Sequence, residues 1–383
     1  MECVRISFAP GAEAFAARST LERVVGRLNR AERWGTLRLD FFAFAEIPAG
    51  GAEEAAQAGI PEETGLPEAA EAGLPEASAD TQSLAAAESP FFCVLLCAEA
   101  TRELLAAVSE GAERGGVRIR FAPLSPGEAE ALYREALGVC RAAPGGTTPE
   151  LAAACGHLAR LLSDAGRTEE AEALYREALD GFRDLSARRG GAEAPLAEAS
   201  RDLARFLYGA GRLRESEKLY CDAMDIYREL SKRNGAYQAP LARTCRDLAM
   251  CLEDAGRPEA AEWFYRNALD GYRKLSERKP AAYAPKVAAV CGNLAGLVKS
   301  AGRVAEAAAL YRIALETYVK LARDDPPQWE PRLAFLYENL AAFERERSPA
   351  AGDALLQSAW LLYQKYPGLA PEAERVRAQL RES

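Results

Sequence analysis

The stretch AEALYREALD, residues 171–180, decides the fold because the chain repeats it. Four further segments superimpose on it: AEALYREALG from residue 129, SEKLYCDAMD from 216, AEWFYRNALD from 261 and AAALYRIALE from 307. Their tyrosines are 42, 45, 45 and 46 residues apart, at Tyr133, Tyr175, Tyr220, Tyr265 and Tyr311. A period of this length is the sequence signature of a repeat protein, in which each repeat is one supersecondary unit.

Turn residues keep the same period as the tyrosines. An Ala-Gly-Arg turn precedes the last four segments, and prolines recur at one further point of each repeat; these residues are Gly166, Gly211, Gly256, Gly302, Pro149, Pro195, Pro240, Pro285 and Pro331. We expect each proline to lie in the first turn of a helix A, and each glycine to end that helix in the left-handed conformation. Helix B follows, with Ala171 and Ala178 beside Tyr175 so that a neighbouring helix can pack around the ring. One hairpin cannot bury both faces, so the pattern predicts a mostly α protein, an α-solenoid of antiparallel hairpins with a groove.

Composition divides the chain into three predicted domains. Residues 1–123 are predicted to form a small α/β domain, because β-rich runs at 4–9, 36–44, 91–98 and 117–121 alternate with helical patterns, which favours a parallel sheet. Residues 124–366 carry the repeats, and 367–383 form a polar C-terminal capping helix. The last repeat is expected to be degenerate, with a helix A at 333–347 that lacks the glycine turn and a shortened helix B at 354–366.

The net charge of −9 is concentrated in one segment. Between Glu46 and Glu88 there are ten acidic residues and no Lys or Arg, so the rest of the chain sums to +1 (−9 plus 10). We expect residues 48–89 to be a disordered, low-complexity acidic insertion, since they have too little apolar surface to offset their ordering entropy. The insertion is either a plain spacer or an internal competitor that folds back over a basic groove.

Few residues suit catalysis or metal binding. The chain has one histidine, His157, and nine cysteines with no CxxC pair, and it lacks the HExxH, GxSxG and GxGxxG motifs. Residues 292–300, GNLAGLVKS, superficially resemble a phosphate loop but are predicted to lie within a helix A. We therefore expect no enzyme activity and no catalytic, cofactor or metal site. No 18-residue apolar run and no basic patch outside the repeats is evident, which favours a cytoplasmic protein that binds neither membrane nor nucleic acid.

The repeats resemble the tetratricopeptide repeat (TPR) family. With Gly166 taken as position 15, the family's signature positions fall on residues of the types that the family uses: Leu158, Ala159, Leu162, Ala171, Tyr175 and Ala178. The resemblance covers roughly residues 125–366, and the 45-residue period is similar to that of kinesin-light-chain-like repeats. It implies a right-handed superhelix that binds a protein or peptide in its concave groove.

The resemblance also indicates which residues line that groove, at positions 2, 5, 9, 12 and 13 of each helix A. The predicted partner-binding residues are Arg160, Arg201, Arg205, Tyr208, Arg243, Arg246, Met250 and Lys299, with Asn293 and Asn339 at the family's asparagine position. His157, Asp202 and Asp247 replace that asparagine in other repeats. Converging guanidinium groups bind carboxylates, so we hypothesise an acidic or C-terminal peptide. The alternative is that these arginines are ordinary helix charges, some of them paired with Glu198 and Glu253.

The N-terminal part carries a second resemblance. Residues 6–12, ISFAPGA, followed by an amphipathic helix, look like the opening of small TIR-like or deoxyribosyltransferase-like α/β domains, although Phe8 and Ala12 replace the serine and the acidic residue of that pattern. The resemblance implies an alternative function: a bacterial signalling or conflict-system effector that acts on a nucleotide near Asp40 and Glu46, with the repeats as sensor. The partner, the pathway and the oligomeric state stay open.

Overall fold

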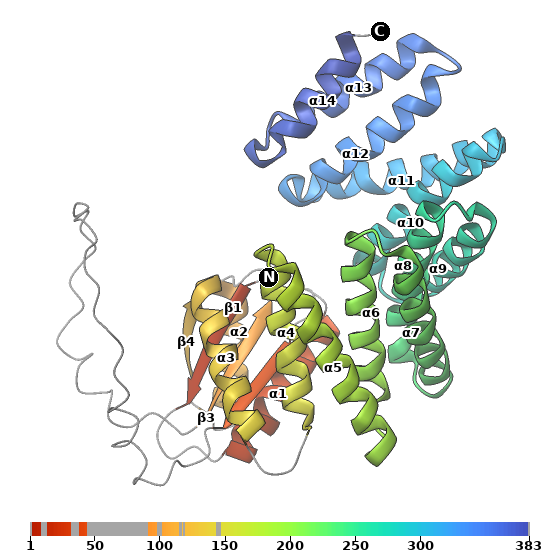
Figure 1. Ribbon diagram of the computed structural model, residues 1–383. Helices are drawn as coiled ribbons and strands as arrows, with labels where there is room; N and C mark the ends of the chain where they lie inside the picture. The colour runs from red at the N-terminus through yellow and green to blue at the C-terminus, as the bar shows by residue number, and fades with distance from the viewer. Residues whose placement is uncertain are drawn as a thin grey trace, which may run out of the picture. The chain divides into compact units, whose positions relative to one another are not determined.

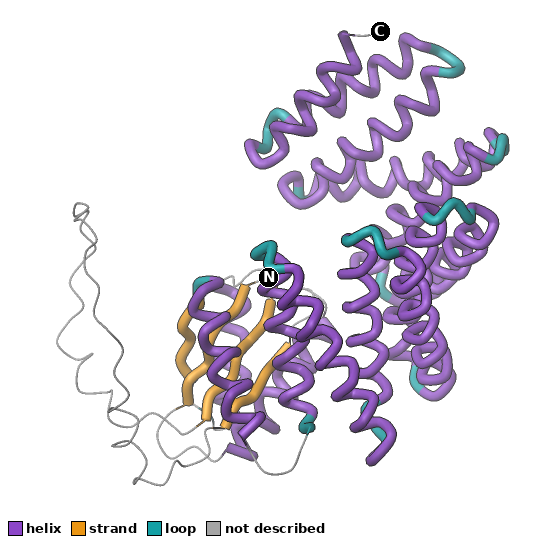
Figure 2. Tube along the Cα trace, in the orientation of Figure 1, coloured by secondary structure: helices purple, strands orange, loops and turns teal. Residues whose placement is uncertain are grey.

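The computed structural model describes residues 2–8, 14–31, 38–43, 91–97, 102–114, 117, 119–142 and 147–381 (Figure 1). The chain divides into two compact units, residues 1–185 and 186–383. Strands occur in the first unit, and helices dominate the rest of the described chain (Figure 2). The predicted acidic insertion at 48–89 lies outside the described residues.

The first unit contains a four-stranded sheet. Its strands are β1 (Glu2–Phe8), β2 (Arg38–Ala43), β3 (Phe91–Cys97) and β4 (Ile119–Leu124), which confirms the four predicted runs. The order is β2-β3-β1-β4, and every neighbouring pair is antiparallel, with Ile6 opposite both Cys93 and Phe121. The predicted parallel sheet is therefore wrong.

Interleaving of two βαβ units explains the difference. β1 and β2 run in the same direction but β3 lies between them, and β3 and β4 run in the same direction but β1 lies between them. This is the split βαβ arrangement of ferredoxin-like folds. Alternation of strands and helices along a sequence does not show which strands become neighbours, so the pattern alone could not distinguish the two sheets.

Two helix pairs cover this sheet. α1 (Ala14–Ala31) packs on α2 (Arg102–Arg114), while α3 (Pro126–Ala142) packs on α4 (Pro149–Asp164). In each pair one helix contacts the edge strand β2 and the other contacts the opposite edge strand β4. Each pair therefore crosses the whole sheet, and the two pairs lie on opposite faces (Figure 1). The first repeat helices thus complete the core of the sheet domain.

The hairpins of the second unit follow the predicted period. Helix α5 (Thr168–Arg189) runs from the first unit into the second. The hairpins after it are α6 (Glu193–Gly209) with α7 (Leu213–Arg233), α8 (Gln238–Asp254) with α9 (Pro258–Arg278), α10 (Pro280–Ser300) with α11 (Val304–Asp324), and α12 (Pro326–Arg345) with α13 (Pro349–Tyr363). Helix α14 (Ala370–Arg381) covers α13. Each helix from α6 to α14 packs against the next, which confirms the predicted solenoid of antiparallel hairpins.

The turn glycines behave as the sequence predicts. Gly166, Gly211, Gly256 and Gly302 follow the four helices A with φ between 72° and 78°, a left-handed conformation that a side chain would strain.

The prolines follow the prediction in three repeats and depart from it in two. Pro149, Pro195 and Pro240 lie in the first turn of α4, α6 and α8. Pro285 and Pro331 lie inside α10 and α12, because these helices begin earlier, at a proline of their own. A proline has no backbone N–H, so the carbonyl four residues earlier loses its helical hydrogen bond. In both helices that carbonyl belongs to the first turn, so the missing hydrogen bond affects only the start of the helix.

The repeated tyrosines form the core of the stack. All five are at most 4% exposed, and the small residues on either side of each are buried as well. Helix α13 has the same pattern with leucine in place of tyrosine. Leu356 lies 45 residues after Tyr311, and the small residues Gly352 and Ala359 lie on either side of it. The last helix A, α12, lacks the glycine turn as predicted, but it has 20 residues and starts at Pro326 rather than at residue 333; α13 is shortened to 15 residues as expected.

A second aromatic series, not recognised in the sequence, joins successive hairpins. Seven residues after the first tyrosine, helix B carries another aromatic ring that packs on a ring at the start of the next hairpin. The pairs are Tyr227 with Tyr237, Tyr272 with Tyr283, and Tyr318 with Trp329, with ring centres 6.1 to 6.4 Å apart. Because both members of a pair repeat at nearly the same spacing, the contact ties each hairpin to the next one.

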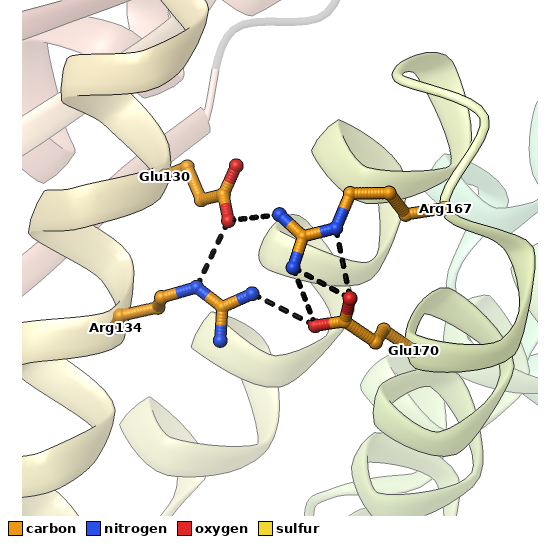
Figure 3. Close-up of polar contacts among 4 residues, drawn as sticks. All are labelled: Glu130, Arg134, Arg167 and Glu170. Atoms are coloured by element: carbon orange, nitrogen blue, oxygen red, sulfur yellow. Dashed lines mark hydrogen bonds and ion pairs between the residues drawn. The ribbon is translucent and has the colours of Figure 1, made fainter.

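The arginine of the Ala-Gly-Arg turn links neighbouring helices B. Arg167 forms ion pairs with Glu130 of α3 and Glu170 of α5, and Arg134 contacts the same two carboxylates (Figure 3). The set recurs between α9 and α11, where Arg266 and Arg303 share Glu262 and Glu306; we call each set of two arginines and two glutamates a turn clamp. Between 22% and 48% of each of these side chains is exposed, so each ion pair contributes modestly to stability and is screened by salt.

Candidate functional site

The first helices of the hairpins in the second unit, α6, α8, α10 and α12, carry most of the predicted partner-binding residues. We call the surface formed by positions 2, 5, 9, 12 and 13 of these four helices the A face. Three contacts link its helices: Arg201 with Asp247, the Tyr208 hydroxyl with Asp254, and Lys299 with the last turn of α12. Each joins one helix A to the helix A of the next hairpin.

A buried ion cluster lies beneath the A face of α6 and α8. Arg201 is 5% exposed, and its guanidinium donates to the Asp202 carboxylate at 3.0 Å and lies 3.6 Å from the Asp247 carboxylate. Both aspartates are buried as well, at 6% and 8% exposure. A buried charge is tolerated only when it is paired, so Arg201 and the two aspartates depend on one another. The predicted surface arginine is thus an interior group.

Two further arginines approach the same carboxylates. Arg246, half-buried, donates to Asp247 through Nε at 3.0 Å, and Arg205 lies 3.6 Å from Asp202 with half of its side chain exposed. Burial alone would lower the pKa of Arg201, but the negative charges of Asp202 and Asp247 outweigh it and raise that pKa above its ordinary value. The two carboxylates therefore favour the charged form of Arg201.

Arg243 differs from these arginines. It is half-buried in α8, and among the described residues it has no ion pair. It lies near Tyr227 and Tyr272, whose pKa values are raised by burial and lowered in part by the positive charge of Arg243. Met250, also half-buried, follows two turns later on the same face of α8. Arg205 and Arg243 thus differ from Arg201 and Arg246, which donate hydrogen bonds to Asp202 and Asp247.

Two other predicted residues, Lys299 and Asn293, stabilise the stack. The Lys299 ammonium donates to the Ala342 carbonyl at 3.0 Å and pairs with Glu346, so it caps α12, which has no glycine turn. Asn293 hydrogen bonds with the Tyr265 hydroxyl, which also donates to Glu253 at 2.8 Å.

The remaining predicted residues include Asn339, which is half-buried in α12. Arg160 is half-buried in α4 of the first unit and is not part of the A face.

A cavity of about 480 Å³ lies between α4 and α5 in the first unit. Its walls include Leu151, Cys155, Arg176 and Glu177. Burial raises the pKa of the Cys155 thiol to about 12, so it stays protonated and is a poor nucleophile at neutral pH. In the part of the chain that the structure describes, no three His, Cys, Asp or Glu side chains are grouped so that they could hold a metal ion.

The antiparallel sheet changes the interpretation of the N-terminal domain. Ligands bind beyond the carboxyl ends of strands in open parallel sheets, and that rule does not apply to this one. Asp40 lies within β2 rather than at its end, and Glu46 lies outside the described residues. The geometry therefore does not favour a nucleotide site at these two residues.

Helix α10 is the one described helix that is long and apolar enough to cross a membrane by length and composition. Sequence reasoning overlooked it. More than half of the relevant window is buried inside the protein, where α10 packs between α9 and α11. The core helix of a soluble protein meets the same criteria, so this is weak evidence for a membrane span.

These observations define a class of protein: a stack of helical hairpins with a 45-residue period, built on tyrosine, alanine and glycine positions. Residues 126–184 and residues 196–235 each match a family model described as Tetratricopeptide repeat. These two matches confirm the predicted tetratricopeptide repeat family for residues 126–184 and 196–235. No curated protein matches the chain at a significant level.

Several solved structures are similar to the chain. BtubC (BKLC) from P. vanneervenii is 24% identical, with a TM-score of 0.48 over 68% of this chain and 94% of that one. A putative kinesin light chain from Podosopora anserina, with nearly identical TPR-like repeats, is 18% identical, with a TM-score of 0.44 over 57% and 98%. The structure of YrrB, a TPR protein with an unusual peptide-binding site, is 17% identical, with a TM-score of 0.34 over 58% and 92%.

Proposed function

We propose that this chain is a non-enzymatic interaction scaffold, and that its A face holds a peptide or protein segment that carries carboxylates. The tetratricopeptide family models support the scaffold function. The observation that supports an acidic partner is the state of two arginines on α6 and α8. Arg201 and Arg246 hydrogen bond with Asp202 and Asp247, whereas Arg205 lies 3.6 Å from Asp202 with half of its side chain exposed, and Arg243 has no ion pair among the described residues.

Exposure and pairing decide which of these arginines can contact a ligand. Arg201 is buried, and a ligand would have to displace two aspartates to reach it. Arg205 is half exposed, and Arg243 has no ion pair among the described residues. A guanidinium group recognises a carboxylate through two parallel N–H donors, and both residues can offer them.

The test compares two charge-reversal variants of the full chain in a pull-down from a lysate of the source cells. The first variant, Arg205→Glu with Arg243→Glu, changes the charge of the A face. The second, Arg214→Glu with Lys218→Glu, makes the same charge change at exposed positions of α7, the helix B of the same hairpin as α6. We expect the first variant to lose a partner that the second retains, with circular dichroism showing that both are folded. If both variants retain every partner, the function lies elsewhere on the molecule.

A further inference from the structure

The outer face of α13 differs from that of the other helices B. Its sequence has no charged residue from Ala354 to Gln364, whereas the matching stretches of α5, α7, α9 and α11 are charged. The exposed residues of this stretch are three or four positions apart, so they share one face of the helix: Ala354, Gln357, Leu361 and Gln364. We call these four residues the α13 face. The buried residues of α13 lie on the opposite side of the helix, where they pack into the core.

The repeat shows which residue type normally occupies the position of Leu361. The residue five positions after the repeated tyrosine is acidic and exposed in four helices B: Asp180, Asp225, Asp270 and Glu316. In α13 the residue five positions after Leu356 is Leu361, which is 52% exposed. A single exposed leucine is ordinary on a protein surface. Here, however, the leucine replaces a recurrent carboxylate on the helix whose outer face has no charge, and the two changes together indicate a contact surface.

The charges at the two ends of the α13 face make it complementary to itself. Asp353 lies at the N-terminal end and Lys365 at the C-terminal end, with 38% and 54% of their side chains exposed. A two-fold axis reverses the direction of the second helix, so each end of one copy meets the opposite end of the other. With the axis at the level of Ala359, Asp353 of each copy lies opposite Lys365 of the other, because both are six positions from residue 359.

We propose that the α13 face binds a second copy of this chain, with the two α13 helices packed antiparallel about a two-fold axis. Leu361 of one copy then lies against Gln357 and Ala354 of the other, at the spacing of about 8–10 Å that packed helices adopt. The A face and the proposed acidic partner take no part in this contact, so the inference does not depend on the proposed function.

Both end charges already have a partner within their own chain. Asp353 pairs with Arg345, and Lys365 pairs with Glu330. Ion pairs at such exposed positions are weak, so both side chains can also contact the second copy. One pair of helices buries less area than a standard protein interface, and we therefore expect a weak dimer whose population depends on concentration.

Sedimentation velocity of the full chain over a wide range of concentrations measures the association. The wild-type chain should be monomeric when dilute and dimeric when concentrated. Leu361→Glu should weaken the association about tenfold or more, because it places two carboxylates in an apolar contact. This variant should keep its fold, as circular dichroism would show, since Glu316 occupies the equivalent position in α11. A wild-type chain that stays monomeric, or an association that Leu361→Glu leaves unchanged, would overturn the proposal.

Exchange of the end charges tests the antiparallel pairing. Lys365→Asp and Asp353→Lys should each weaken the association, because like charges then meet at both ends of the contact. A mixture of the two variants should recover dimers, because every end then meets the opposite charge. Lys320→Asp makes the same change at the equivalent position of α11 and is the matched control, which should associate as the wild type does.

Two outcomes of this exchange would overturn the proposal: no recovery in the mixture, or an equal loss of association with Lys320→Asp. A different protein as the occupant of the α13 face would overturn it as well. In that case the wild-type chain would stay monomeric, and Leu361→Glu would lose a partner that the wild-type chain retains in a pull-down.

Discussion

Replacing Arg201 by alanine should destabilise the second unit far more than the loss of a surface charge would. Arg201 is 5% exposed, and its removal leaves the buried Asp202 with the longer contact to Arg205 at 3.6 Å, while Asp247 keeps its hydrogen bond from Arg246. Breaking a buried ion pair by deleting one partner costs about 3–5 kcal/mol, because a buried charge is left uncompensated. A loss of about 3 kcal/mol lowers Tm by roughly 10 °C in a domain of this size.

Urea denaturation followed by circular dichroism measures this loss directly. The control replaces both aspartates by asparagine, and Arg201→Met is then compared in the two backgrounds. If uncompensated carboxylates cause the loss, Arg201→Met should cost little in the Asp202→Asn, Asp247→Asn background, where an apolar side chain of similar length packs against neutral amides. Equal losses in the two backgrounds, or a loss below about 1 kcal/mol for Arg201→Ala, would refute the assignment of a buried ion cluster.

Three further predictions concern the turn, the clamp and a buried carboxyl. Gly256→Ala should lower the free energy of unfolding by about 1–2 kcal/mol, because φ at this position is 72°; an unchanged urea midpoint would contradict the left-handed cap. Arg303→Ala should lower Tm at low ionic strength, and the difference from wild type should vanish near about 1 M NaCl, since the turn clamp is exposed; a salt-independent difference would contradict an electrostatic role. Burial raises the pKa of Glu253 despite the hydrogen bond from Tyr265, so its contribution to stability is present at low pH and lost as pH rises through the folded pKa. Glu253→Gln, which mimics the protonated form, should therefore raise Tm at neutral pH and match wild type below about pH 4, where a persistent difference would contradict the reasoning.

The repeat region was predictable because its signals recur. The glycine turns, the buried tyrosines and the small residues beside them all stand where the period places them, and even α13 can be found by counting 45 residues from Tyr311 to Leu356. The start of α10 was misplaced because Pro285 was taken for the first turn, although Pro280 occupies that turn. The domain limits at residues 123 and 366 stay predictions.

The sheet could not be predicted to the same degree. Each strand was identified from its own residues, but strand order depends on which distant segments pair, and no residue of β1 indicates whether β2 or β3 will lie beside it. The role of α3 and α4 in covering the sheet was likewise invisible, since their apolar faces have the helical period whatever they pack against.

The candidate site shows how a correct pattern can be assigned to the wrong role. Arg201 and Arg246 occupy the position that faces the groove in this family, yet each is followed by the aspartate that replaces the family's asparagine. The repeated Arg-Asp pair was therefore the signal, 45 residues apart in the sequence, that these arginines would bind carboxylates of their own chain. In this chain each aspartate accepts a hydrogen bond at 3.0 Å from the arginine that precedes it, Arg201 for Asp202 and Arg246 for Asp247. The proposed acidic partner is therefore expected to contact Arg205 and Arg243, which are not followed by an aspartate in the sequence. Arg205 and Arg243 are the two arginines of the predicted groove on α6 and α8 that the proposed function retains, and each lies about one turn of helix from Arg201 or Arg246.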